Sequence, residues 1–216
     1  MIRRLLSLLA PAALSTAAVA ASPSAPVQTY VQAPGPLGPL KGTMLSPASG
    51  RRAMMLIIPG SGSTDRDGNN PLGVKAATYR LLAEGLAERG IGAVRIDKRG
   101  MFASTAAVAD GNAVTIDDYV ADVGAWIAVI RKETGASCVW LLGHSEGGLV
   151  ALAAAQKLPD ICGLVLVSAA GRPLGDGCGR SFAPIRRMRQ SFPRRWRQSN
   201  RSRPASTLPL PAGILR

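Results

Sequence analysis

A serine lies at the centre of the pattern Gly-x-Ser-x-Gly, which spans residues 143–147. The apolar residues 139–142 before it are typical of a buried strand, and residues 148–155 after it are typical of a helix. A strand, this pattern and a helix in that order predict a sharp turn that holds the hydroxyl of Ser145 above the edge of a sheet. The motif therefore predicts nucleophilic chemistry at Ser145.

A glycine-rich loop is the second candidate for this chemistry. The continuous apolar run 53–58 predicts a strand buried on both faces, and Pro59-Gly60-Ser61-Gly62 follows it. Glycines on both sides of Ser61 let the backbone turn its amides inward. We therefore predict an oxyanion hole formed by the backbone N–H groups of Ser61 and Glu146.

A serine nucleophile of this kind needs a base, and the sequence offers one histidine. His144 is the only histidine among the 216 residues, and it directly precedes Ser145. The side chain before the serine of such a turn is directed away from it, so we do not expect His144 to act as the base. The sequence therefore predicts a nucleophile without the group that would activate its hydroxyl.

Two charged clusters follow buried strands. Residues 65–70 have the sequence Asp-Arg-Asp-Gly-Asn-Asn, and residues 97–100 have the sequence Asp-Lys-Arg-Gly. Such groups can hold a loop through carboxylate–amide and arginine–carboxylate bonds. Since open α/β sheets bind ligands beyond the carboxyl ends of their strands, both clusters are expected near the site. We expect them to support loops rather than to contact a substrate.

The elements that must position these residues alternate along the chain. Buried strands are predicted by apolar runs at residues 53–58, 91–96, 138–142 and 163–167. Helical periods separate these runs, which predicts an α/β fold with a mostly parallel sheet and helices on both faces. Two short extended pieces in the Pro- and Gly-rich segment before them, 27–32 and 40–45, predict an edge hairpin.

Two helices are predicted in detail. Residues 117–131 carry an apolar stripe formed by Tyr119, Val120, Val123, Trp126, Ile127 and Ile130. Asp122 is placed away from this stripe, and Thr115 is the predicted N-cap. Residues 79–89 place Leu82 and Leu86 one turn apart on a common face.

Length and charge indicate one globular domain with a basic tail. The chain has 216 residues, 47% of them apolar, which suits one domain of ordinary size. Its net charge of +13 is uneven, because residues 1–171 hold 15 basic and 12 acidic residues, whereas residues 172–216 hold 11 arginines and one acid, Asp176. The excess charge belongs to the tail, so the domain itself gives no nucleic-acid signal.

The two ends of the chain are predicted to lie outside the folded core, which we place at residues 53–175 after the edge hairpin and linker of residues 22–52. Residues 1–21 have a positive start, an apolar run and small residues near Ala20, which predict a signal peptide and a secreted or periplasmic protein. Residues 176–216 are Arg- and Pro-rich and predict disorder. A frameshift near residue 176 and a genuine basic tail are both open explanations of this segment.

The cysteines leave two possibilities. Three cysteines, Cys138, Cys162 and Cys178, are too few for a disulfide scaffold and lack metal-ligand spacing. Cys138 and Cys162 open two strands that we expect to be neighbours, so they could pair if their Cα atoms lie within about 7 Å. The favoured interpretation is that both are small buried apolar side chains. No metal or organic cofactor is predicted.

Taken in order, these motifs resemble the α/β-hydrolase superfamily, and most of all its secreted bacterial carboxylesterase-type members. The resemblance runs over about residues 40–175 and includes the oxyanion loop, both charged clusters and residues 143–148. It implies ester substrates and a Ser–acid–His triad. The family takes its acid and its histidine from loops after later strands, and this sequence supplies neither. Met101-Phe102-Ala103 also departs from the family pattern, in which a second glycine is more usual.

We therefore predict an α/β-hydrolase fold without its last strands, in a C-terminally truncated protein. Its function would be hydrolysis of a small-molecule carboxylic ester through an acyl-enzyme on Ser145, and it would be inactive as written. An alternative is a binding module that keeps the pocket of a hydrolase and has lost catalysis. A third is attachment of the arginine-rich tail to a polyanion or a membrane surface. Neither specific nucleic-acid binding nor stable membrane insertion is expected.

Overall fold

The computed structural model describes residues 25–48, 50 and 53–171. All the helices and strands below belong to one compact unit that ends at Ala169. The predicted signal peptide and the arginine-rich tail lie outside the described residues. No helix among the described residues is both long and apolar enough to cross a membrane.

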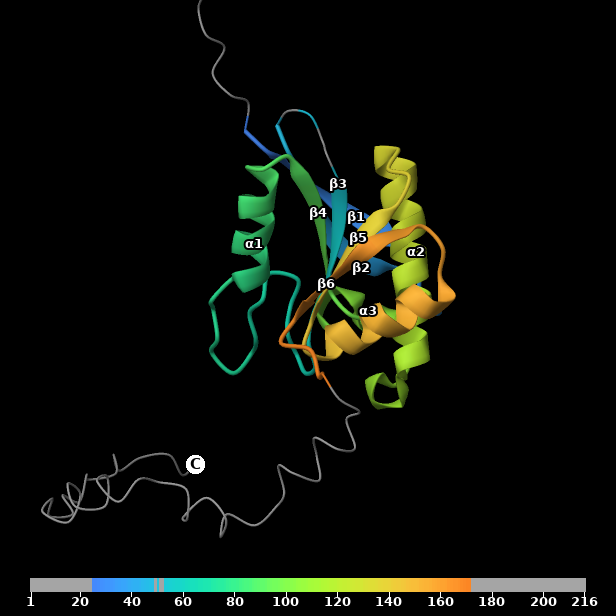
Figure 1. Ribbon diagram of the computed structural model, residues 1–216. Helices are drawn as coiled ribbons and strands as arrows, with labels where there is room; N and C mark the ends of the chain where they lie inside the picture. Colours follow the sequence, from blue (N-terminus) through green and yellow to red (C-terminus); the bar gives the residue numbers. More distant parts are fainter. Residues whose placement is uncertain (1–24, 49, 51–52, 172–216) are drawn as a thin grey trace, which may run out of the picture. The chain divides into compact units, whose positions relative to one another are not determined.

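A six-stranded sheet with the order β1-β2-β4-β3-β5-β6 forms the centre of this unit (Figure 1). The strands are β1 (Val27–Ala33), β2 (Leu40–Ser46), β3 (Ala53–Ile58), β4 (Ile91–Ile96), β5 (Val139–His144) and β6 (Ile161–Val167). Strand β2 pairs antiparallel with β1 and with β4, and the other neighbours pair in parallel. The predicted mostly parallel sheet and edge hairpin are both confirmed.

Helices cover both faces of the sheet, as predicted. Helix α1 (Thr78–Ala87) lies on one face, and α2 (Ile116–Thr134) and α3 (Glu146–Lys157) lie on the other (Figure 1). Two short 3-10 helices, η1 (Phe102–Ala107) and η2 (Gly111–Ala113), connect β4 to α2. Each face has its own apolar core, since one cluster of buried side chains gathers under α2 and α3 and another under α1.

Helix α2 confirms its predicted cap and stripe, with one correction. The hydroxyl of Thr115 accepts a hydrogen bond from the backbone N–H of Asp118, whose carboxylate in turn accepts one from the Thr115 N–H. Trp126 and Ile130 of the predicted stripe are fully buried. Asp122 was placed away from the stripe, but it is buried as well, because Arg99 reaches it from the loop after β4.

The predicted apolar face of α1 is partly wrong. Tyr79, Ala83 and Ala87 are its buried residues, whereas Leu82 is exposed and Leu86 is only partly covered. Small alanine side chains let the helix pack closely on the sheet, and Tyr79 fills the space at its first turn. The spacing of the leucines therefore predicted the extent of α1 about correctly, but it predicted the wrong side of the helix as the buried one.

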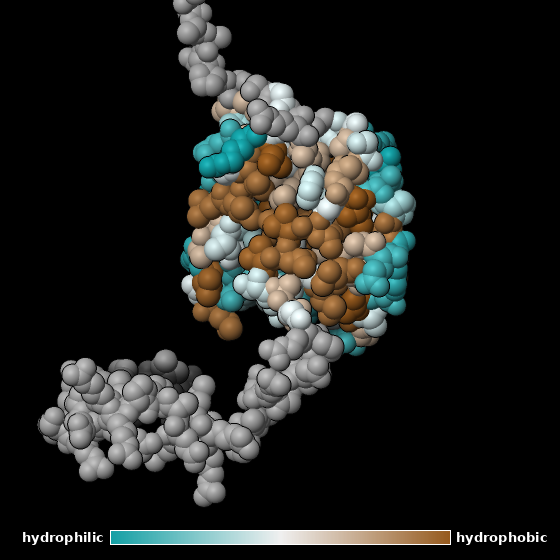
Figure 2. All heavy atoms as spheres, in the orientation of Figure 1, coloured by the Kyte–Doolittle hydropathy of each residue, from teal (hydrophilic) through white to brown (hydrophobic). Residues whose placement is uncertain are grey.

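Strand β6 is the last strand of the sheet formed by the described residues. It pairs with β5, and its residues are half-buried up to Val165 and exposed at Leu166 and Val167. Figure 2 shows a broad hydrophobic area in the centre of the face where Figure 1 places β6. Among the described residues no strand pairs with the outer side of β6, and an unpaired edge of this kind is a template for pairing with another chain.

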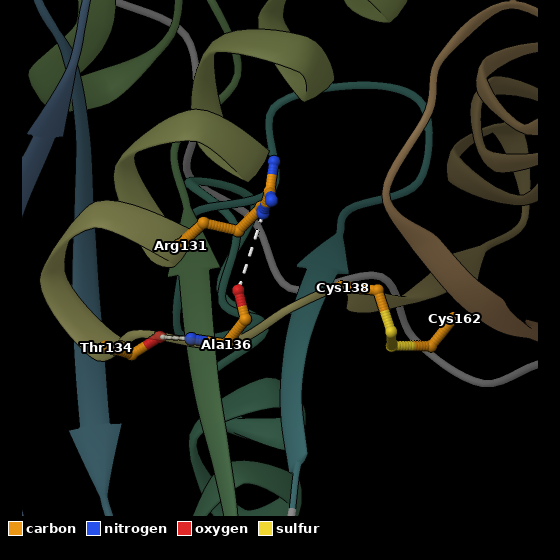
Figure 3. Close-up of a disulfide and its surroundings, with 5 residues drawn as sticks. All are labelled: Arg131, Thr134, Ala136, Cys138 and Cys162. Carbon is orange, nitrogen blue, oxygen red and sulfur yellow. Dashed lines mark hydrogen bonds between the residues drawn. A yellow bond between two sulfur atoms is a disulfide. The ribbon is translucent and has the colours of Figure 1, made fainter.

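Cys138 and Cys162 form a disulfide, so the favoured interpretation of two separate buried thiols is wrong (Figure 3). Because β5 and β6 pair in parallel, the first residues of the two strands lie side by side. The Cα atoms of Cys138 and Cys162 are 5.2 Å apart, within the range for a disulfide. Beside the bond, the turn between α2 and β5 is closed by a hydrogen bond of 3.3 Å from the Ala136 N–H to the Thr134 hydroxyl. The disulfide closes a loop of 24 residues, which includes Ser145.

Replacing both bridged cysteines by serine is expected to lower the free energy of unfolding by about 3 kcal/mol, because the unfolded chain regains the entropy of that loop. Urea unfolding followed by tryptophan fluorescence would measure the change. Cys178→Ser is the matched control and should leave the midpoint unchanged. A double variant as stable as the native chain would show that the bond contributes nothing.

Candidate active site

The turn predicted to hold the nucleophile, residues 143–147, lies at the junction of β5 and α3, and we call it the nucleophile turn. Ser145 has φ 52° and ψ −115°, a backbone conformation that non-glycine residues rarely adopt. Its N–H donates to the carbonyl of Val167 at 2.9 Å, and its own carbonyl accepts from the N–H of Gly148 at 3.0 Å. These bonds hold the strained residue between the two elements, as the Gly-x-Ser-x-Gly pattern predicts.

The two glycines of the pattern are required by close backbone approach. A Cβ added to Gly143 would collide with the carbonyl oxygen of Gly147, and one added to Gly147 would collide with the carbonyl oxygen of Ile58. The start of α3 is therefore pressed against the ends of β5 and β3. This packing places the turn directly beside the loop that follows β3.

The predicted oxyanion loop lies against Ser145. Gly60 is buried, and a Cβ built on it would lie 3.2 Å from the Cβ of Ser145. Ser61, the next residue, is exposed. The sequence predicts the backbone N–H groups of Ser61 and Glu146 as the oxyanion donors. Their predicted role as oxyanion donors stays a prediction.

Tyr79 joins this loop to the nucleophile turn, a role that no pattern in the sequence predicted. The Gly60 N–H donates to the Tyr79 hydroxyl at 3.3 Å, and that hydroxyl lies 2.8 Å from Nδ1 of His144. Burial raises the pKa of Tyr79, so the hydroxyl keeps its proton. Tyr79 is therefore a neutral bridge that fixes the separation of the two backbone segments.

His144 takes part in this bridge. Its Nδ1 is engaged by Tyr79, and the two rings meet edge to face with centroids 5.9 Å apart. The expectation that His144 does not act as the base stays a prediction. Among the described residues, no group of three or more His, Cys, Asp or Glu side chains is arranged to hold a metal ion.

The first charged cluster braces the oxyanion loop, as predicted. The carboxylate of Asp65 accepts hydrogen bonds from the backbone N–H groups of Asp67 and Asn69 at 2.9 and 2.8 Å. Arg66 forms an ion pair with Asp97, in which Nε and Nη2 both donate to Oδ2, at 3.1 and 2.5 Å, while the Arg66 backbone N–H donates to Oδ1 at 2.8 Å. Asp67 pairs with Arg95 on β4. The loop after β3 is thus tied to β4 by two ion pairs.

The second cluster reaches the nucleophile turn through Lys98. This side chain is 3% exposed, and its Nζ lies 3.0 Å from Oε1 of Glu146 and 5.1 Å from the ring centroid of Tyr119. An ammonium that is removed from water gains from both a carboxylate and an aromatic face. Lys98 therefore fixes the residue that directly follows Ser145.

Arg99 extends the same support to α2. Its Nε and Nη2 contact the two carboxylate oxygens of Asp122 at 2.8 and 2.6 Å, and its Nη1 contacts Asp118 at 3.0 Å. Burial raises the pKa of Asp122, and the Arg99 guanidinium opposes that rise. The hydrogen bonds that Arg99 donates to Asp122 raise the pKa of Arg99. The pair locks the loop after β4 to the helix.

Comparisons with known proteins agree with this architecture. The family model described as serine aminopeptidase, S33 matches residues 72–208. Among curated proteins none matches. A cold-adapted esterase from an Arctic intertidal metagenomic library has a TM-score of 0.52 and 22% identity over 64% of this chain and 59% of its own. A lidless α/β serine hydrolase from Xanthomonas campestris has a TM-score of 0.52 and 26% identity over 68% of this chain and 63% of its own.

A thermostable carboxyl esterase from Bacillus coagulans, solved with glycerol, extends the comparison to lower identity. Its TM-score is 0.56 at 15% identity, and the match covers 81% of this chain and 55% of the esterase. At this identity the likeness concerns the fold alone. The chain described here spans less than two thirds of the length of each of these three proteins.

Proposed function

Because this chain belongs to the α/β hydrolases, in the family described as serine aminopeptidase, S33, we propose that Ser145 is a nucleophile for acyl transfer from carboxylic esters. The observation that carries the proposal is the strained backbone of Ser145 between β5 and α3, directly beside Gly60. Strain of this kind persists where the surrounding structure enforces it and where function requires it.

In the proposed reaction, the Ser145 oxygen attacks the ester carbonyl and the alcohol leaves, which forms an acyl-enzyme that water then hydrolyses. The oxyanion that develops accepts hydrogen bonds from the N–H groups of Ser61 and Glu146. Tyr79 and Lys98 support this arrangement, since Tyr79 fixes the loop that contains Ser61 and Lys98 holds the side chain of Glu146.

Turnover by this sequence is proposed to be very slow. His144 is the only histidine, and its Nδ1 is bonded to Tyr79. Without a base the Ser145 hydroxyl stays neutral, and the oxyanion donors and substrate binding are then the remaining sources of catalysis. The substrate is proposed to be a small-molecule ester, with no specific nucleic-acid partner and no stable insertion into a membrane.

The proposed location is outside the cytoplasm, in the periplasm or the medium. The Cys138–Cys162 disulfide supports it, because such bonds persist in oxidising compartments. The signal-like composition of residues 1–21 supports it independently.

Ser145→Cys tests the proposed nucleophile without needing a base, since a thiol ionises near pH 8.5 by itself. At pH 8.5 the thiolate should attack p-nitrophenyl acetate, form a thioester and release one equivalent of p-nitrophenolate. Its rate should exceed that of Ser63→Cys, an exposed serine in the loop after β3, by about tenfold or more because of the oxyanion donors. Both variants would carry Cys178→Ser to remove the third cysteine.

Equal rates for the two thiols, compared at equal thiolate fraction, would refute an oxyanion hole at Ser145. The scaffold would then be a binding module rather than an incomplete hydrolase.

A further inference from the structure

A cavity of about 640 Å³, lined by both polar and aromatic side chains, lies on the sheet. Tyr30 on β1, Thr43 on β2 and Arg95 on β4 are direct neighbours in register and line it together. Gln32 and Lys41 form the next row, and they also line it. We call this space the hairpin trough. Its described lining residues include neither Ser145 nor Ser61, so the proposed reaction does not account for it.

The charges in the trough are largely neutralised within its own wall. Arg66 pairs with Asp97, and Arg95 pairs with Asp67 and donates to the side-chain oxygen of Gln28 at 3.0 Å. Such pairs attract a free ion weakly, because Arg66 and Arg95 each already have an anion. Arg66, Asp67 and Gln28 keep part of their surface accessible and present donors and acceptors side by side. This arrangement suits a neutral ligand that carries hydroxyl groups, each of which donates and accepts.

Two aromatic rings lie beside these polar groups. Tyr30 is 82% exposed, and Phe102 at the start of η1 is 37% exposed. Phe102 has φ 46°, in the left-handed region where a bulky residue is a conformational outlier. The hydrolase pattern favours a second glycine in this segment, which would remove that strain. A strained aromatic side chain kept at the rim of a cavity indicates that the ring itself has a role.

From this combination we propose that the hairpin trough binds a neutral glycan chain. The apolar C–H faces of sugar rings pack on aromatic side chains, and their equatorial hydroxyls pair with amides, carboxylates and guanidinium groups. The volume falls within the range of small-ligand sites. Because β1 is an end strand of the sheet formed by the described residues, the trough is not closed by a further strand on that side, and an extended chain can continue past it. The proposal does not depend on Ser145.

Surface-based binding measurements with the full chain immobilised at low density would test it. The probes are cellohexaose, xylohexaose and chitohexaose as neutral glycans, with pentagalacturonate as an anionic comparison. At least one neutral probe should bind saturably in the millimolar range or tighter, and Tyr30→Ala and Phe102→Gly should each weaken it about fivefold or more. Leu72→Ala is the control, since Leu72 is 92% exposed and does not line the trough.

Phe102→Gly also separates binding from folding. Glycine tolerates a positive φ, so this variant should melt at the same temperature as the native chain or higher while it binds more weakly. Undiminished binding by Phe102→Gly, binding of pentagalacturonate alone, or binding of none of the probes would overturn the proposal.

Discussion

A fluorophosphonate probe is expected to label Ser145 about 10⁴-fold more slowly than it labels an α/β hydrolase with a complete triad. The reason is that the probe reacts with a serine whose proton is removed by a neighbouring base. The ring nitrogen Nδ1 of His144 is bonded to Tyr79, and the sequence holds no second histidine. Intact-protein mass spectrometry over several hours would measure the rate.

Ser145→Ala is the control for that measurement, since without the hydroxyl the slow labelling at this position should be absent. Rapid stoichiometric labelling of the native chain that disappears in Ser145→Ala would show that an unidentified base serves the serine. In that case the proposed slow turnover would be wrong, whereas the assignment of Ser145 as nucleophile would be strengthened.

Replacing Arg99 by methionine is expected to lower the free energy of unfolding by about 3 kcal/mol or more at pH 7, because it leaves a buried carboxylate without its cation. The side chains of Arg99 and Asp122 are 7% and 8% exposed. Since burial already raises the pKa of Asp122, loss of Arg99 should raise it further. The folded variant then binds a proton more readily than the unfolded chain, so its stability should fall as pH rises.

The destabilisation relative to the native chain should therefore be smaller at pH 4, where Asp122 in the variant is largely protonated, than at pH 7. Denaturant unfolding at both pH values would measure it. Arg99→Met with Asp122→Asn is the matched control, since it has no carboxylate to titrate there and should lose the pH dependence. An Arg99→Met variant with the same loss at both pH values would show that Asp122 is not the group left uncompensated.

Much of the fold could be predicted from the sequence, because it is encoded locally. Continuous apolar runs bounded by Pro or Gly predicted strands such as β3 and β4 with correct ends. The cap at Thr115 depends on residues three positions apart, so it too could be predicted. The nucleophile turn belongs to the same class, since its two glycines lie within one short segment. The buried face of α1 could not be predicted in this way, because it depends on which side chains of the sheet pack against the helix.

The support of the site was decided by tertiary structure. Tyr79 lies 19 residues from Gly60 and 65 residues from His144, and parallel packing of β3 beside β5 brings them together. The disulfide likewise depends on the pairing of β5 with β6. The burial of Asp122 depends on Arg99, which contacts it from the loop after β4. Local patterns report which residues are apolar or constrained, but the partner of a polar side chain is set by strand order and register. Strand order and register follow from packing over the whole sheet, and no single segment of the sequence contains that information.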